Sequence, residues 1–223
     1  MTKTLAISRR RILQALGFSA AAGVLGKLLF AARAWAAPSA YAAPSPGTER
    51  EIFLTIGKML FSPSGKKRTA IAVNGSVPGP LLRWREGETV TIHVANTLDE
   101  MTSIHWHGIL LPFGMDGVPG VSFPGIKPGE TFTYTFPVKQ SGTYWYHAHS
   151  DFQEQLGHYG AIIIDPAGPD PVKADREHVV FLSDWSDENP ERIMGNLKRR
   201  GGWYNWNRRT LGDFFRDVKE KGF

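Results

Sequence analysis

The chain has 223 residues, of which 42% are hydrophobic and 12% aromatic. This composition supplies a buried core for one domain and part of a second, and it excludes an intrinsically disordered chain. The net charge of +5 does not indicate a nucleic-acid partner, because it comes from the N-terminus. Residues 1–36 hold six of the 26 basic side chains and no acidic one. The rest of the chain therefore has 20 basic and 21 acidic residues.

The first 36 residues have the pattern of a twin-arginine export signal. Ser8-Arg9-Arg10-Arg11-Ile12-Leu13 precedes an apolar, Ala- and Gly-rich stretch, and small residues at Ala34-Trp35-Ala36 mark a cleavage site. Cleavage as late as residue 42 is an alternative. Lys27 interrupts the apolar stretch, which argues against a stable membrane anchor. We therefore expect the twin-arginine machinery to export the chain to the periplasm.

Residues 49–165 alternate short β-rich runs with Gly- and Pro-containing turns, which predicts an all-β sandwich. Val90, Ile92 and Val94 alternate with polar residues, as expected for a strand with one buried face. The expected strands are Ile52–Leu60, Thr69–Asn74, Glu88–Asn96, Ser103–Leu110, Glu130–Pro137, Gly142–His149 and Tyr159–Asp165.

A linker is expected at residues 166–176, which open with a Pro-, Gly- and Asp-rich run. His178–Leu182 then has the pattern of the first strand of another β domain. Helix starts follow at Asn189-Pro190 and at Thr210, three residues before Asp213. We expect residues 177–223 to be the incomplete start of a second domain, and the chain to be a fragment or the product of an interrupted gene.

Four of the seven histidines form two H-x-H pairs, His105-Trp106-His107 and His147-Ala148-His149. Residues i and i+2 of a strand project from one face, so each pair presents two imidazoles side by side. Neutral imidazole suits copper and zinc, and the absence of cysteine and of an H-E-x-x-H helix favours copper. The alternative is that each histidine is a hydrogen-bonded core residue.

The three other histidines lack this pairing. We expect His93, His158 and His178 not to bind metal, because they lie on a polar strand face, in a Gly-flanked turn and at the start of the post-linker strand.

Four segments together resemble the first cupredoxin domain of multicopper oxidases, and the likeness is to copper-resistance (CopA-type) proteins. These segments are Val73-Asn74-Gly75-Ser76-Val77-Pro78-Gly79-Pro80, Ser103-Ile104-His105-Trp106-His107-Gly108, Met115-Asp116-Gly117-Val118-Pro119-Gly120 and Gly142-Thr143-Tyr144-Trp145-Tyr146-His147-Ala148-His149-Ser150. The resemblance implies a cupredoxin-like Greek-key β-sandwich at 49–165 and the start of a second cupredoxin domain after the linker.

The resemblance also implies a role for each motif residue. His105 would bind the type 2 copper of a trinuclear centre, and His107, His147 and His149 the type 3 pair. Asp116 matches an acidic residue thought to assist proton delivery, although Asp before Gly117 is also a natural turn residue. The implied partners are copper ions, dioxygen and a small reducing substrate, either cuprous ions or a phenol.

The chain lacks part of what this family needs for turnover. A type 1 copper requires a cysteine thiolate, and the sequence contains no cysteine. The family's H-x-x-H-x-H and H-C-H motifs are also absent. We therefore expect this chain alone to be inactive and the type 1 site to lie in a C-terminal part. Two alternatives are a periplasmic copper-sequestering protein and a scaffold that has lost copper, although both H-x-H motifs are intact.

Overall fold

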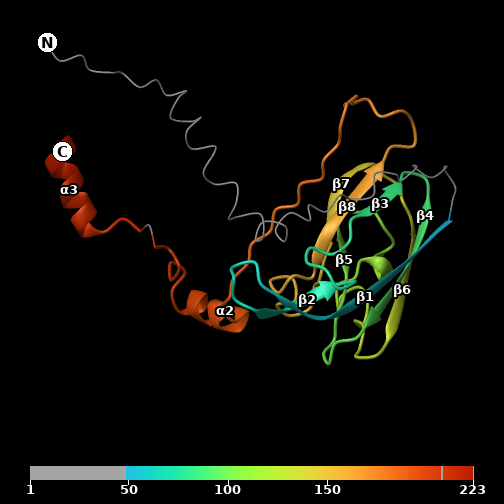
Figure 1. The fold of residues 1–223 in the computed structure, drawn as a ribbon, viewed down its shortest axis with the longest axis horizontal. Coiled ribbons are helices and arrows are strands. Elements are labelled where there is room, and N and C mark those ends of the chain that lie inside the picture. Colours follow the sequence, from blue (N-terminus) through green and yellow to red (C-terminus); the bar gives the residue numbers. More distant parts are fainter. Residues whose placement is uncertain (1–48, 207, 223) are drawn as a thin grey trace, which may run out of the picture. The chain divides into compact units, whose positions relative to one another are not determined.

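The computed structural model describes residues 49–206 and 208–222, and residues 49–165 form two four-stranded sheets packed as a sandwich (Figure 1). The expected export signal at 1–36 lies outside the described residues. Among those described, no helix is long and apolar enough to cross a bilayer. The strands are β1 (Glu49–Phe61), β2 (Arg68–Val73), β3 (Leu82–Arg85), β4 (Thr89–Asn96), β5 (His105–His107), β6 (Thr131–Pro137), β7 (Gly142–His147) and β8 (Tyr159–Asp165).

The first sheet has the strand order β2-β1-β4-β6 and is mixed. β1 pairs antiparallel with β2 and parallel with β4, which in turn pairs antiparallel with β6. The alternation predicted for β4 is confirmed, because Val90, Ile92 and Val94 are fully buried and the residues between them are half-buried. This sheet therefore contributes one wall of the core.

The second sheet has the order β3-β8-β7-β5 and carries both H-x-H pairs. Each of the seven expected strands has a counterpart, but β3 was not expected, because four residues are too short for a clear period. The expected strand Ser103–Leu110 shrinks to the three residues of β5. Gly108 adopts a φ of 82°, a conformation that L side chains rarely adopt, and this turn ends the strand.

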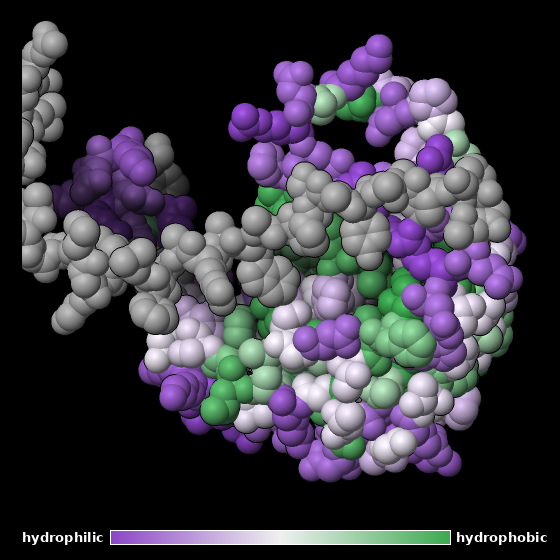
Figure 2. All heavy atoms as spheres, turned by 45° about the vertical axis from the view of Figure 1, so that its right-hand side comes forward, coloured by the Kyte–Doolittle hydropathy of each residue, from purple (hydrophilic) through white to green (hydrophobic). Residues whose placement is uncertain are grey.

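Large aromatic side chains fill the space between the sheets. Trp84, Trp106, Tyr134 and Tyr146 are fully buried, and the Trp106 ring centroid lies 5.2 to 6.1 Å from those of the other three and of Phe136. Trp106 faces this core because strand side chains alternate, which turns its two flanking histidines away. Figure 2 shows one outer face of the molecule, on which hydrophobic and hydrophilic residues are interspersed.

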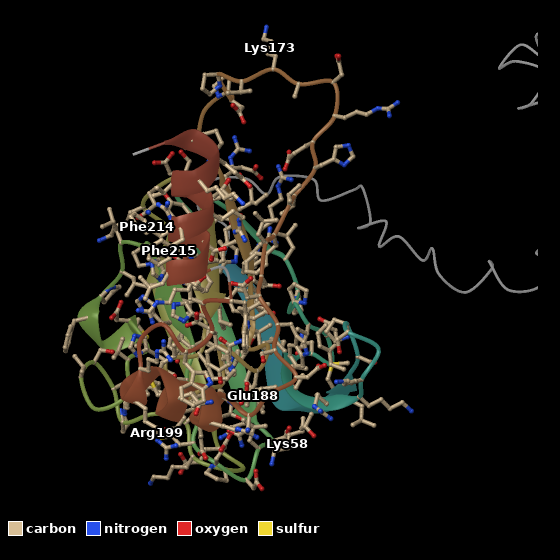
Figure 3. All side chains as sticks on the ribbon, turned by 90° about the vertical axis from the view of Figure 1, so that its left-hand side faces the viewer. Lys58, Lys173, Glu188, Arg199, Phe214 and Phe215 are labelled. Carbon is tan, nitrogen blue, oxygen red and sulfur yellow. The ribbon has the colours of Figure 1, made fainter. Side chains whose placement is uncertain are left out.

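Arg83 of β3 fixes both ends of the segment expected to be the linker. Its guanidinium forms two hydrogen bonds with Asp165, at 2.9 and 2.7 Å, and two with Glu177, at 2.9 and 3.1 Å. Between these carboxylates the chain makes an exposed loop, with Lys173 at its outer end (Figure 3). Two bidentate contacts from one guanidinium give this loop a defined base.

The prediction of a strand at His178–Leu182 is wrong. These residues have no strand pairing in the part of the chain that the structure describes. An extended segment needs a neighbouring strand, and this one instead stacks Phe181 on Tyr159, with ring centroids 5.5 Å apart.

Both expected helices are confirmed. They are α2 (Pro190–Arg199), capped by Asn189, and α3 (Leu211–Lys221), which starts with a capping box of Thr210 and Asp213. Phe214 and Phe215 lie next to each other on α3 (Figure 3).

Candidate metal centre

The pairing of β5 with β7 brings the two H-x-H motifs together at one edge of the sandwich. The strands are antiparallel, and their register places His105 directly opposite His147 and His107 opposite Trp145. The single copper centre that the resemblance implies needs both motifs at one edge, and the backbone pairing places them there. His149 follows two residues after the end of β7.

The four imidazoles form a compact group. The ring centroid of His105 lies 5.5 Å from that of His107, 5.4 Å from that of His147 and 5.7 Å from that of His149. One nitrogen from each of His105, His107 and His147 falls within 4.8 Å of the other two, a spacing that a metal ion could bridge. His149 is outside this tighter set of three, although its ring is only 6.0 Å from that of His147.

One close contact in the group joins two ring nitrogens. His107 Nδ1 lies 3.1 Å from His147 Nε2. Two imidazole lone pairs repel each other at this distance unless one nitrogen carries a proton or a cation lies nearby. Trp145 restricts both rings, because its indole stacks on His147 at 4.2 Å and on His107 at 4.9 Å between centroids.

The orientation of His105 depends on the Asp116 turn. His105 Nδ1 lies 2.7 Å from the Asp116 carbonyl oxygen and 3.5 Å from Asp116 Oδ1. The turn approaches closely because Gly117 has no side chain: a Cβ there would lie 1.7 Å from the Ile104 carbonyl oxygen. Since Nδ1 donates to the carbonyl, Nε2 keeps its lone pair for a metal.

His147 is the most buried of the four and is oriented in a similar way. Its Nδ1 lies 2.9 Å from the Ala148 carbonyl oxygen and 2.7 Å from Glu154 Oε2. Burial lowers the pKa of His147, against the opposing influence of the Ala148 carbonyl and the Glu154 carboxylate. A lowered pKa favours the neutral imidazole, which is the form that binds metals.

Backbone contacts fix the position of His149. Its N–H donates to Ser103 Oγ at 3.0 Å, and Ser103 Oγ in turn lies 2.9 Å from Ser150 Oγ. Both serines are buried, while the His149 side chain is exposed. A buried serine pair therefore anchors the backbone of His149, while its imidazole remains open to solvent.

The remaining histidines lie apart from this group. His93 contacts Thr133 and Glu51 at 2.9 Å each on the outer face of the first sheet, and His178 is exposed after the linker. His158 is fully buried beside Thr102, and burial lowers its pKa to about 3. His158 was expected in a turn, but it lies directly before the first residue of β8.

The donor set fits copper. Within the described residues, the group near β5 and β7 offers imidazole nitrogens and no thiolate, and copper accepts neutral imidazole readily. Two of the rings have Nδ1 bound to a carbonyl, and such contacts orient metal-binding histidines. Glu154, Ser103 and Ser150 were not predicted as parts of the site, because only the folded chain brings them to the histidines.

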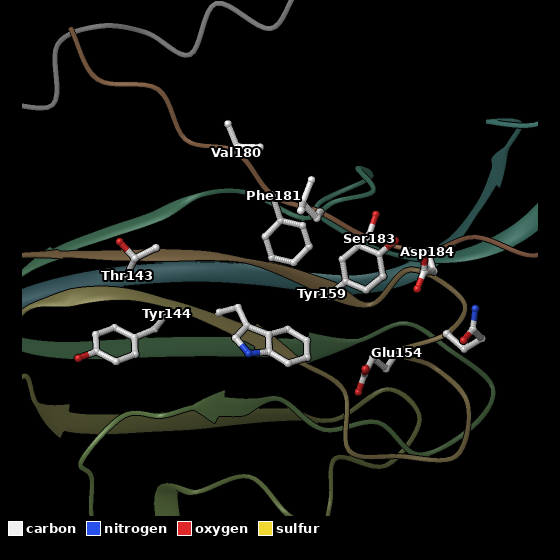
Figure 4. Close-up of a pocket in the computed structure, with 11 residues that line it drawn as sticks. Thr143, Tyr144, Glu154, Tyr159, Val180, Phe181, Ser183 and Asp184 are labelled. Carbon is white, nitrogen blue, oxygen red and sulfur yellow. The ribbon is translucent and has the colours of Figure 1, made fainter.

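A pocket of about 490 Å³ opens beside the histidine group. Figure 4 shows Glu154 on one wall, with Tyr159 and Phe181 facing each other nearby. The opposite wall is the post-linker segment from Val180 to Asp184. Glu154 thus contacts a buried histidine on one side and an open cavity on the other.

Comparison with known proteins gives consistent matches. The sequence model of the family described as multicopper oxidase matches residues 55–169. Copper resistance protein A from Pseudomonas syringae pv. tomato is 54% identical over 97% of this chain and 35% of its own length, and its Escherichia coli counterpart is 54% identical over 96% and 35%. The chain thus spans about a third of the length of these curated relatives.

Solved structures give the same result. A mutant of the laccase from B. aclada has a TM-score of 0.63 and 40% identity, covering 70% of this chain and 29% of that one. A multi-copper oxidase from Pseudomonas thermotolerans has a TM-score of 0.54 and 35% identity, covering 56% and 31%. With a family match over more than half of its residues and a cupredoxin-like sandwich, this chain belongs to the multicopper oxidase family.

Proposed function

We propose that this chain supplies half of a trinuclear copper centre to a multicopper oxidase of periplasmic copper resistance. The complete protein would couple one-electron oxidation of cuprous ions or phenolic substrates to the reduction of dioxygen to water. The observation that carries this proposal is the pairing of His105 with His147, which gathers four imidazoles at one edge of the sandwich.

Each histidine has an assigned place in this proposal. His105 binds the type 2 copper, and His107, His147 and His149 bind the type 3 pair. Copper, when bound, would pass electrons from the reducing substrate to dioxygen, and the chain holds the ligand rings in place. Asp116 supplies protons: its carboxylate is one-third exposed and lies 3.5 Å from His105 Nδ1, so it can exchange protons with water beside the site.

The other half of the centre would lie in a part of the complete protein that this chain does not contain. A three-copper centre needs ligands around each ion, and four imidazoles from one side cannot complete it. The type 1 copper requires a thiolate, and this sequence has no cysteine. We therefore assign oxidase activity to the complete protein and expect none from the 223-residue chain. Residues 1–36 would direct export by the twin-arginine machinery.

The deciding experiment replaces His107 by Ala in the complete protein. Oxygen uptake with a phenolic substrate should fall to background, because a ligand of the oxygen-reducing centre is lost, while the blue absorption of the type 1 copper persists. His149→Ala should behave in the same way. His93→Ala is the matched control, since His93 lies on the outer face of the other sheet. Wild-type oxygen uptake by the His107→Ala protein would refute the proposal.

Asp116→Asn tests the proton-delivery role. Turnover should slow while the copper count stays at the wild-type value, because the side chain delivers protons and the Asp116 backbone carbonyl still accepts from His105. An oxygen electrode and metal analysis on the same sample separate the two effects. Loss of copper from this variant would instead assign Asp116 to holding the site together.

A second candidate function is copper sequestration without turnover. It is favoured by the exposure of His107 and His149 in this chain, which leaves imidazoles accessible to a copper ion. Binding should be weak and should lack the intense blue band of a thiolate site, because the sequence has no cysteine. Titration of the purified chain with Cu²⁺, followed by visible absorption, tests this candidate. An intense blue band would show that the site has been misassigned.

A further inference from the structure

We infer that Glu154 is a positioning residue for the copper centre, which acts by holding His147 with Nδ1 protonated and Nε2 directed at the metal. The inference rests on the proposed function, because it names a residue that supports one of the proposed ligands. Glu154 lies in the turn between β7 and β8, seven positions after His147, and it belongs to neither H-x-H motif.

The first argument is the set of oxygens around His147 Nδ1. Glu154 Oε2 lies 2.7 Å away and the Ala148 carbonyl oxygen 2.9 Å away. Both are acceptors, so a proton on Nδ1 is attracted by two oxygens at once, and a lone pair there would be repelled by both. A neutral imidazole carries one N–H, so Nε2 is left with the lone pair that a metal needs.

The second argument is the direction in which Nε2 points. It lies 3.1 Å from His107 Nδ1, inside the histidine group, while Nδ1 faces the Glu154 turn. If the ring turned over or the tautomer changed, this nitrogen would lose its place as a ligand. The carboxylate therefore acts on the orientation and basicity of the ring, as second-layer carboxylates do in other metal sites.

The arrangement around His105 supports the same assignment. His105 Nδ1 is held by the Asp116 carbonyl at 2.7 Å, with the Asp116 carboxylate at 3.5 Å. Each of these two cross-strand partners thus has one backbone carbonyl and one carboxylate oxygen at Nδ1. At His147, however, the carboxylate is the nearer of the two groups, and it comes from a different residue than the carbonyl.

A role in folding alone does not explain Glu154. Its side chain is 49% exposed and borders the pocket, so it contributes little to the core. The turn that carries it is held by its neighbours: Gln153 Nε2 donates to the Met101 carbonyl at 2.8 Å, and Leu156 accepts from the Ile71 N–H at 2.9 Å. Removing the Glu154 carboxylate should therefore leave the turn in place.

The test uses the 223-residue chain and two variants, Glu154→Ala and Glu154→Gln. Nitrogen-15 NMR of the metal-free protein reports which ring nitrogen of His147 carries the proton. We expect the wild-type ring to be protonated at Nδ1 and the Ala variant to show a mixture of tautomers. Gln keeps an acceptor oxygen and should retain much of the wild-type tautomer.

Copper affinity provides the second readout, measured by competition of Cu²⁺ with a chromophoric chelator. The Ala variant should bind about 10- to 100-fold more weakly, and the Gln variant should fall between it and the wild type. Gln155→Ala is the matched control, because Gln155 is exposed in the same turn and borders the same pocket. It should change neither readout.

His147→Ala separates this inference from the proposed function. If His147→Ala weakens copper binding and Glu154→Ala changes neither tautomer nor affinity, Glu154 has no positioning role and the copper site stands. If His147→Ala leaves copper binding unchanged, the proposed ligand itself is wrong and the inference falls with it. Circular dichroism of each variant checks that the fold is retained.

Discussion

The sandwich at 49–165 and the segment at 166–222 differ in how their side chains are buried. Every buried hydrophobic residue among those described lies between Leu54 and Ile164, whereas after the linker only Asn196 is buried. Val180, Leu182 and Leu211 remain more than three-quarters exposed. The difference shows that the histidine group is built on the part of the chain that has its own core, and we expect its geometry not to depend on α2 or α3.

The largest expected effect comes from removing the core side chain between two proposed ligands. Trp106→Ala should lower the free energy of unfolding by about 3–5 kcal/mol, because a fully buried indole is replaced by a cavity. Phe215→Ala, at a side chain 66% exposed on α3, should change it by less than about 0.5 kcal/mol. Urea denaturation of both variants measures the contrast, and equal losses would mean that the two regions share one core.

A second prediction uses the buried His158. Its pKa is about 3 in the folded chain, because burial disfavours the charged ring, against about 6.5 in an unfolded chain. Below pH 6.5 the unfolded chain therefore takes up a proton that the folded chain does not. His158 should thus lower the free energy of unfolding by about 1.4 kcal/mol per pH unit down to about pH 3.

His158→Gln removes this proton uptake while keeping a polar group next to Thr102. Between pH 6 and pH 4.5, the free energy of unfolding of this variant should fall less steeply with falling pH than that of the wild type, by about 1.4 kcal/mol per pH unit. Urea titrations at three pH values in this range give the slope for each protein. An unchanged slope would show that His158 is protonated in the folded chain as well.

The third prediction concerns the base of the loop between the two regions. Arg83→Lys replaces two bidentate contacts by single ones to Asp165 and Glu177. If opening of the loop becomes easier by about 1 kcal/mol, trypsin should cleave after Lys173 roughly fivefold faster. Gel analysis of a time course measures this rate. Lys58→Arg is a suitable control, since Lys58 of β1 pairs with Asp99 at the surface, away from Lys173 (Figure 3).

The sequence predicted features that depend on local patterns. Strand alternation located β4 and β6, the i, i+2 spacing placed His105 and His107 on one face of β5, and the capping residues Asn189 and Thr210 marked both helix starts. The expected strand Gly142–His149 ends at His147, so the same argument does not cover His149. These features depend on residues close together in the chain. Local periodicity is sufficient to predict them, because the backbone geometry of a strand or helix fixes where neighbouring side chains point.

Several features that depend on distant residues were not predicted. The pairing of β1 with β4 is parallel, and the ring of His105 is oriented by a carbonyl eleven positions away. The strand expected at His178–Leu182 failed for the same reason, since its apolar pattern specifies no partner strand. Glu154 could have been identified only by knowing that the turn after β7 folds back on His147.

The smallest expected effect lies in the region without a core. Asn189 accepts hydrogen bonds from the N–H groups of Glu191 and Arg192, at 2.8 and 3.4 Å, and Pro190 occupies the first helical position. Asn189→Ala removes this cap and should destabilise α2 by about 1 kcal/mol. The amides of α2 should then exchange with solvent about fivefold faster.

The same substitution tests whether the two regions are energetically independent. The hydrogen bonds of Asn196 in α2 and of Tyr204 are local: Asn196 Nδ2 donates to the Tyr204 hydroxyl at 2.8 Å, and that hydroxyl donates to Glu188 at 3.0 Å. None of these groups belongs to the sandwich, so loss of the cap should leave amide exchange in β7 unchanged. Hydrogen exchange followed by mass spectrometry resolves the two segments in one experiment. Faster exchange in β7 as well would show that α2 stabilises the strand that carries His147, and the separation between the two regions would then be incorrect.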